Sequence, residues 1–241
     1  MSTLRSNLIE PLSGTTVTLG ASGDAVTVPA GATLKTNTAK DAGGNVLWTS
    51  DGSGNLSSVN SALSPHMVFI ASQTASNSSS ISFTTGFDNT YDEYIFHFVN
   101  IQPATDSAFF TFQVSSNGGT TYGMSILSTN MVSTVGEDGS NGRIEYVTAG
   151  DLANATGYQP IGLYIGSAAD ESFSGEMHFF EPAGFFPKHF YSVGSLCSSS
   201  VYVRNPMIGG MVHSTTAVNA IDFKMSTGNI ANGTIRLYGI N

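Results

Sequence analysis

The stretch Ala108-Phe-Phe-Thr-Phe-Gln-Val114 places Ala, Phe, Phe and Val at alternate positions, and Ile221-Asp-Phe-Lys-Met225 repeats this alternation. Because neighbouring side chains of a β-strand point to opposite faces, each stretch predicts a strand with one apolar face. The run Tyr94-Ile-Phe-His-Phe-Val99 is apolar on both faces, which is typical of a strand covered on both sides. These three stretches predict packed β-sheets.

Short apolar segments separated by turn residues continue on both sides of these stretches, from residue 67 to residue 240. Eleven strands over this length are typical of a β-sandwich, and we expect a jelly-roll-like one. The expected strands are Met67–Ser72, Ser80–Thr85, Asp92–Asn100, Ala108–Ser115, Thr121–Ser128, Arg143–Thr148, Ile161–Gly166, Phe173–Glu181, His189–Leu196, Val218–Ser226 and Thr234–Ile240.

The composition agrees with an all-β fold. Only 10% of the 241 residues are charged, whereas about 25% is usual in soluble domains. A helical bundle would need many Glu, Lys, Arg and Gln residues on its exposed faces. The hydrophobic fraction of 40%, with 15 Phe and 9 Tyr, is too high for a disordered chain.

The charge balance excludes several classes of partner. The net charge is −9, from 8 basic and 17 acidic residues, and the basic residues are scattered singly. Nucleic acid and anionic membrane surfaces both require clustered Lys and Arg, so we expect neither as a partner. No apolar run is long enough to span a bilayer, so no membrane insertion is expected. A single cysteine, Cys197, excludes an intrachain disulfide and is compatible with folding in a reducing cytosol.

Residues 1–62 form a second region, because they contain no Phe, no Tyr and only one Trp, Trp48. Short β-like words such as Val17-Thr-Leu19 and Val26-Thr-Val28 recur between Gly- and Ser-rich turns. Such a segment lacks the apolar area for a core of its own and becomes stable if copies close around an axis. We therefore expect residues 11–62 to form a homotrimeric β-repeat shaft that ends in a Gly-rich neck at residues 41–58. A flexible Gly/Ser/Thr linker is the alternative.

Several of these stretches resemble parts of tailed-bacteriophage fibre proteins, especially those of marine and cyanobacterial phages. The repeats Ser13-Gly-Thr-Thr-Val-Thr-Leu-Gly20 and Ala25-Val-Thr-Val-Pro-Ala-Gly-Ala-Thr-Leu34 resemble fibre repeats. The following stretches are similar to the head domains of fibre or adhesin-like virion proteins: Tyr91-Asp-Glu-Tyr-Ile-Phe-His-Phe-Val-Asn-Ile-Gln-Pro-Ala-Thr-Asp106, Val114-Ser-Ser-Asn-Gly-Gly-Thr-Thr-Tyr122, Lys188-His-Phe-Tyr191 and Gly228-Asn-Ile-Ala-Asn-Gly-Thr-Ile-Arg-Leu-Tyr-Gly-Ile240. These motifs are strand and turn signatures, and they carry no receptor-binding residue over to this chain.

The resemblance implies a non-enzymatic virion structural protein that is made in the host cytoplasm and exposed on the particle. We expect a homotrimeric tail or baseplate fibre whose head, residues 63–241, contacts the host cell surface. Residues 1–10 would attach it to other virion proteins through Leu4, Leu8 and Ile9. A decoration or fibre protein on the capsid surface is the first alternative.

The second alternative is a small glycan-degrading tailspike, because Glu171, Glu176 and Glu181 could supply a carboxylate pair. A rim of solubilising charges is the simpler interpretation of the same residues. The chain contains no nucleophile-elbow, P-loop, zinc-protease or CxxC motif. The loop Glu137-Asp-Gly-Ser-Asn-Gly142 supplies only the beginning of a calcium-site pattern. We therefore expect no catalytic residue, metal or cofactor.

Glycan binding remains a candidate activity, because sugar sites combine an aromatic face with polar partners on loops. Two loops offer this combination, and ordinary Gly/Asn turns are the alternative for each. The candidate receptor-binding or glycan-binding residues are Asn117, Thr121, Tyr122, Asn154 and Tyr158.

Overall fold

The computed structural model describes residues 36–57, 59–60 and 66–240, which divide into an N-terminal unit (Met1–Ser64) and a C-terminal unit (Pro65–Asn241). All regular structure in the described residues is β, apart from one 3₁₀ turn, η1 (Thr148–Gly150). The expectation of an all-β chain is thus confirmed. Most of the expected shaft, and the expected attachment residues Leu4, Leu8 and Ile9, lie outside the described residues.

In the N-terminal unit, the described residues form a three-stranded antiparallel sheet in the order β1 (Thr38–Lys40), β2 (Val46–Ser50), β3 (Leu56–Ser57). Both turns are built in the same way. The Asp41 carboxylate accepts hydrogen bonds from the backbone N (2.8 Å) and Nδ2 (3.0 Å) of Asn45. Asp51 does the same for Asn55, at 3.1 and 2.7 Å. The stretch expected as a neck therefore contains strands and ordered turns.

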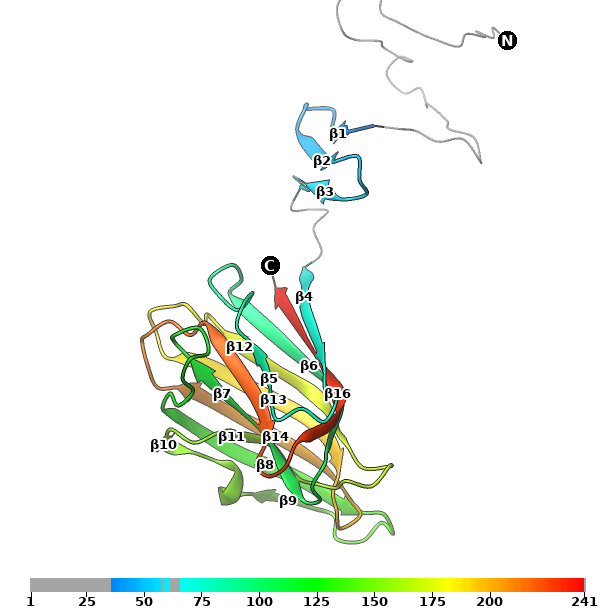
Figure 1. Cartoon of the computed structure of the whole chain (residues 1–241), viewed down its shortest axis with the longest axis vertical. Helices are drawn as coiled ribbons and strands as arrows, with labels where there is room; N and C mark the ends of the chain where they lie inside the picture. Colours follow the sequence, from blue (N-terminus) through cyan, green and yellow to red (C-terminus); the bar gives the residue numbers. More distant parts are fainter. Residues whose placement is uncertain (1–35, 58, 61–65, 241) are drawn as a thin grey trace, which may run out of the picture. The chain divides into compact units, whose positions relative to one another are not determined.

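The C-terminal unit contains a nine-stranded and a four-stranded antiparallel sheet (Figure 1). The order in the larger sheet is β10-β8-β14-β13-β12-β6-β16-β4, with β9 also paired to β8. Its first and last strands along the chain, β4 in cyan and β16 in red, lie side by side in Figure 1. Its bounds are β4 (Met67–Thr74), β6 (Glu93–Pro103), β8 (Ile126–Gly136), β9 (Arg143–Tyr146), β10 (Ala153–Ala155), β12 (Phe173–Phe180), β13 (Lys188–Cys197), β14 (Tyr202–Val212) and β16 (Ile230–Ile240).

The smaller sheet has the order β11-β7-β15-β5, with bounds β5 (Ile81–Phe83), β7 (Ala108–Ser115), β11 (Gln159–Ile165) and β15 (Ala220–Met225). The inner faces of the two sheets share one aromatic core. Phe98 of β6 lies 5.2 Å from Phe110 of β7 and 5.3 Å from Phe223 of β15, measured between ring centroids. Such edge-to-face pairs contribute about 0.5–1.5 kcal/mol each beyond the area they bury. The packed faces make this unit a β-sandwich, as expected.

The alternating stretches that decide the fold occupy β7 and β15, at the centre of the smaller sheet. Other expected strands differ at their ends, and the largest difference concerns residues 121–136. The expected strand Thr121–Ser128 begins only at Ile126 and continues to Gly136, because residues 116–125 form a loop.

The 11-residue strand β14 was not expected, because Pro206, Gly209 and Gly210 are strand-breaking residues. The sheet tolerates each of them for a local reason. The pairing between β13 and β14 is interrupted at Asn205 and Pro206, so no β13 residue pairs with the proline. A Cβ on Gly210 would lie 2.6 Å from the backbone O of Leu127 and 2.8 Å from Phe190, so glycine is required there by close packing.

Candidate functional site

Two of the expected glycan-binding residues, Asn117 and Thr121, hold their own loop together. Asn117 Oδ1 accepts hydrogen bonds from the Ser115 hydroxyl (2.7 Å) and from the backbone N of Thr121 (3.0 Å). Asn117 Nδ2 donates to Thr121 Oγ1 at 2.9 Å. Their polar groups therefore order the loop between β7 and β8.

Tyr122 and Tyr158, which come from different loops, meet at Asp222 of β15. The Tyr158 hydroxyl donates to Asp222 Oδ2 at 2.9 Å, and the Ser82 hydroxyl donates to the other oxygen of this buried carboxylate. Burial, followed by the hydrogen bond to Asp222 and its charge, raises the pKa of Tyr158. Burial also raises the pKa of Tyr122, against an opposing contribution from the Ser82 hydroxyl. Lys224 Nζ lies 3.8 Å from the centroid of the Tyr158 ring.

Gln113 of β7 fastens both of these loops to the outer face of the smaller sheet. Its side chain is fully buried, and Nε2 donates to the backbone O atoms of Met124 (3.1 Å), Thr156 (3.2 Å) and Gly157 (2.7 Å). The loops thus bring the half-buried Tyr122 and Tyr158 together over the smaller sheet, whereas Asn117 and Thr121 are exposed and hydrogen-bond within their own loop.

The fifth candidate, Asn154 on β10, takes another environment. It is exposed, has a positive φ of 54°, and its Oδ1 lies 2.8 Å from Nδ1 of His213. Asn and Asp tolerate this left-handed conformation better than other side chains. The pairing of β10 with β8 shifts register between Ala153 and Ala155, so Asn154 occupies an irregularity of this strand.

The three glutamates considered as hydrolytic carboxylates are spread along β12. Glu171 precedes the strand and its carboxylate accepts from the backbone N of Ala168 (2.8 Å), Glu176 lies in the middle, and Glu181 follows the end. Five residues of extended strand span about 17 Å, whereas hydrolytic carboxyl pairs lie about 5–9.5 Å apart. The structure does not bring these three residues together as a pair of that kind.

The outer face of the nine-stranded sheet differs from its surroundings because it is rich in exposed apolar side chains. Ten of the fourteen exposed large apolar residues in 66–240 lie on strands of this sheet, and only one, Tyr164, lies on a strand of the smaller sheet. The ten are Met67, Phe69, Leu127, Met131, Val135, Ile144, Tyr146, Tyr191, Val203 and Met207. Large exposed apolar patches are uncommon on monomeric proteins, and where they occur they often mark interaction surfaces.

The strand register divides this face into two halves. One row of cross-strand neighbours runs through Ser72, Arg236, His97, Glu176, Val193, Met207, Met131 and Tyr146. Its Arg, His and Glu members, Arg236, His97 and Glu176, lie on β16, β6 and β12. The outward residues of β13, β14, β8 and β9 include no Asp, Glu, Lys or Arg, and we call these four strands' part of the outer face the uncharged half.

Within the uncharged half, a ridge lies between two hollows. The ridge is the cross-strand pair Met131 and Met207, which are 49% and 61% exposed. A hollow of about 430 Å³ lies beside it over Gly209 and Gly210, lined also by Leu127, Thr129 and His189. A second hollow, of about 360 Å³, lies on the other side around Asn205 and Ile144, and Arg143 at the edge of β9 also lines it.

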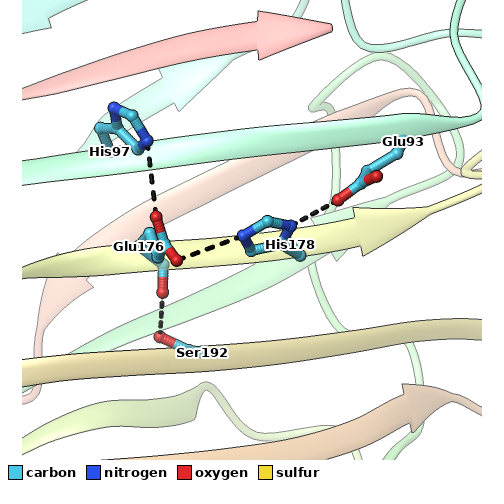
Figure 2. A network of polar contacts seen from close by, with 5 residues as sticks. All are labelled: Glu93, His97, Glu176, His178 and Ser192. Atoms are coloured by element: carbon cyan, nitrogen blue, oxygen red, sulfur yellow. Dashed lines mark hydrogen bonds and ion pairs between the residues drawn. The ribbon is translucent and has the colours of Figure 1, made fainter. Parts of the chain in front are cut away.

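The other half carries a chain of alternating imidazoles and carboxylates (Figure 2). Glu93 contacts Nδ1 of His178, whose Nε2 lies 3.4 Å from Glu176, and the second oxygen of Glu176 lies 3.6 Å from Nε2 of His97. Tyr191 stacks on His178 with ring centroids 4.4 Å apart. Burial, with the nearby charges of Glu93 and Glu176, raises the pKa of Tyr191. The chain links β6 to β12 and orders this half of the face.

Among the described residues, no group of three or more His, Cys, Asp and Glu side chains is arranged to hold a metal ion. The loop that begins like a calcium site closes as a β-turn, in which the backbone N of Gly139 donates to the backbone O of Gly136 at 2.9 Å. No helix in the described part of the chain could cross a membrane.

The residues of the uncharged half were not candidates from the sequence, because neither β14 nor the second part of β8 was expected as a strand. A signal was present in Leu127-Ser-Thr-Asn-Met-Val-Ser-Thr-Val135, where apolar residues recur among β-branched and small polar ones. The alternation is blurred because both faces mix polar and apolar residues. Comparison of the chain with known protein families, curated proteins and solved structures finds no match.

Proposed function

We propose that this protein is a non-enzymatic structural protein of a bacteriophage virion, a homotrimeric tail or baseplate fibre. In this proposal, residues 11–62 form an intertwined β shaft and the C-terminal unit is a jelly-roll-like head that contacts the host cell surface. The proposal rests on the sequence resemblance and on one structural observation, the absence of buried residues from the described part of the N-terminal unit.

Every described side chain between residues 36 and 60 is exposed or only half-buried, including Trp48. A three-stranded sheet is stable in water only if it buries an apolar face. The strands and turns of this unit are ordered by hydrogen bonds, yet this described segment has no core to pack against. Copies of the same chain, arranged around an axis, would supply the missing contacts, since homo-oligomers favour closed symmetry.

A trimeric head would act through multivalency. Three weak sites on one particle raise the effective affinity for a repetitive cell surface without any new contact. Because Asn117 and Thr121 bind one another, Tyr158 binds Asp222 and the Tyr122 hydroxyl is buried, a host glycan would have to engage other residues of the head.

The mass of the full-length chain in solution tests the proposal. Light scattering should give three times the chain mass of 25.1 kDa across a range of concentrations. A monomer at every concentration would overturn the fibre proposal. Antibody labelling of purified virions would then place the protein on the tail, on the baseplate or on the capsid, and no labelling of any virion would overturn the virion assignment.

A further inference from the structure

We propose that the uncharged half of the nine-stranded sheet's outer face binds a second copy of this chain, with the Met131–Met207 ridge of one copy entering the Gly209 hollow of the next. This inference deepens the proposed function, because it names where the copies of a self-associating chain meet. It places part of the contact in the C-terminal unit, whereas the sequence-based argument places it in the shaft.

The uncharged half is large enough to form most of an interface. Strands β8 and β14 have 11 residues each, β13 has 10 and β9 has 4. At about 3.4 Å per residue and about 4.8 Å between strands, the four strands give a face of about 590 Å². A standard protein–protein interface buries about 800 Å² on each partner.

The charge distribution favours a second copy as the occupant. Each chain carries a net charge of −9, so two copies repel each other unless their contact surfaces are free of acidic groups. The outward positions of β8 and β14 are Leu127, Thr129, Met131, Ser133 and Val135, opposite Met211, Gly209, Met207, Asn205 and Val203. None of these ten residues is charged, although 17 acidic residues are available in the chain.

The shape of this surface is complementary to itself. Met207 projects from β14, and two residues further along the same face Gly209 leaves a depression in which an added Cβ would meet no atom within 4 Å. Because the ridge and the hollow lie side by side on one face, each copy can place its ridge in the hollow of the same neighbour, which is the self-complementary contact of a two-fold pair. Methionine suits the ridge because its flexible side chain adapts to irregular apolar space.

Thiol labelling of the full-length chain tests this contact directly. In a Cys197→Ser background, Thr129→Cys places a thiol in the Gly209 hollow, and Thr227→Cys places a matched thiol in the exposed turn between β15 and β16. If at least nine-tenths of the chains are associated, the thiol from Thr129→Cys should react with a maleimide at no more than about one-tenth of the rate of a free thiol. The thiol from Thr227→Cys should react at the rate of a free thiol.

Filling the hollow tests its role without disturbing the fold. Gly209→Val, added to Thr129→Cys, should restore fast labelling and lower the mass of the oligomer. Gly157→Val is the matched control, because an added Cβ is equally unobstructed there and Gly157 lies on a loop over the other sheet. Protection that survives Gly209→Val would overturn the ridge-into-hollow contact.

The outcomes separate this inference from the proposed function. A trimer in which both introduced thiols react equally fast would overturn the inference and leave the fibre proposal standing. A dimer with a protected hollow would uphold the inference and overturn the trimer. A monomer with two equally reactive thiols would overturn both.

Discussion

The two sheets of the C-terminal unit share one core, but loops cover the outer face of only one of them. Loops cover the outer face of the four-stranded sheet, which is polar and includes the buried residues Thr111, Gln113, Ser115 and Asp222. The outer face of the nine-stranded sheet has no such cover, although Met131, Met207 and Ile144 project from it. A polar face under loops requires hydrogen bonds for every group, whereas an apolar face in water is costly until something covers it.

The outer face of the smaller sheet therefore finds its main contacts within one chain, whereas the outer face of the larger sheet does not. On the smaller sheet the carbonyl groups of the covering loops find their donor in Gln113, and the Asp222 carboxylate finds two hydroxyl donors. On the larger sheet the apolar side chains of β8, β9 and β14 have no cover within the described residues. Variants on the first face should therefore change stability, and variants on the second should change association.

The largest effect is expected from Gln113→Ala, which leaves three loop carbonyls without their donor and Val114 N without its acceptor. Unsatisfied buried groups cost about 1–3 kcal/mol each, partly recovered by water, so we expect the free energy of unfolding to fall by about 3 kcal/mol. Urea denaturation measures it. Thr129→Ala, on the exposed face, is the control and should change stability by less than about 0.5 kcal/mol. Equal effects of the two variants would contradict the contrast between the faces.

An intermediate effect is expected from Gly210→Ala, because the new Cβ would lie within 2.8 Å of Leu127 O, Phe190 and Ser128. Overpacking of this kind costs about 1–3 kcal/mol. Gly157→Ala provides the control, since its Cβ meets open space away from the uncharged half, and it should leave stability within about 0.5 kcal/mol. Thermal unfolding of the two variants compares them, and an equal loss for Gly157→Ala would contradict overpacking as the cause.

The smallest effect concerns pH and Tyr158. Its folded-state pKa is raised by burial and by Asp222, above an unfolded value of about 10. The stabilisation from the neutral hydroxyl is therefore complete below about pH 10 and is lost as the pH rises towards the folded-state pKa. We expect Tyr158→Phe to lower the free energy of unfolding by about 1 kcal/mol at neutral pH and by less above about pH 10.

Urea unfolding of both proteins at several alkaline pH values measures this difference. Tyr238→Phe, on the outer face of the nine-stranded sheet, is the control. A difference between wild type and Tyr158→Phe that does not shrink at high pH would contradict the assignment of this stability to the hydrogen bond from the neutral hydroxyl to Asp222.

Alternation of apolar and polar residues was sufficient to predict β7, β15 and the all-β class, because the side-chain period of a strand is a local property. The polar residues on β7 were visible in the sequence, but their role was not. Gln113 acquires it only when residues 124, 156 and 157 fold over the same face. The candidate residues Tyr122 and Tyr158 were chosen as separate loop residues, and only the fold brings them together at Asp222.

What the sequence by itself determined is that this chain is built of strands. From composition and charge it also predicts that residues 1–62 form no large core and that nucleic acid is not a partner. The tertiary structure alone decided that Pro206, Gly209 and Gly210 belong to a long strand, and that Met131 stands opposite Met207 on an uncovered face. The reason is physical. Alternation tells which residues share a face, but long-range pairing decides which strands are neighbours and which of the two faces is covered.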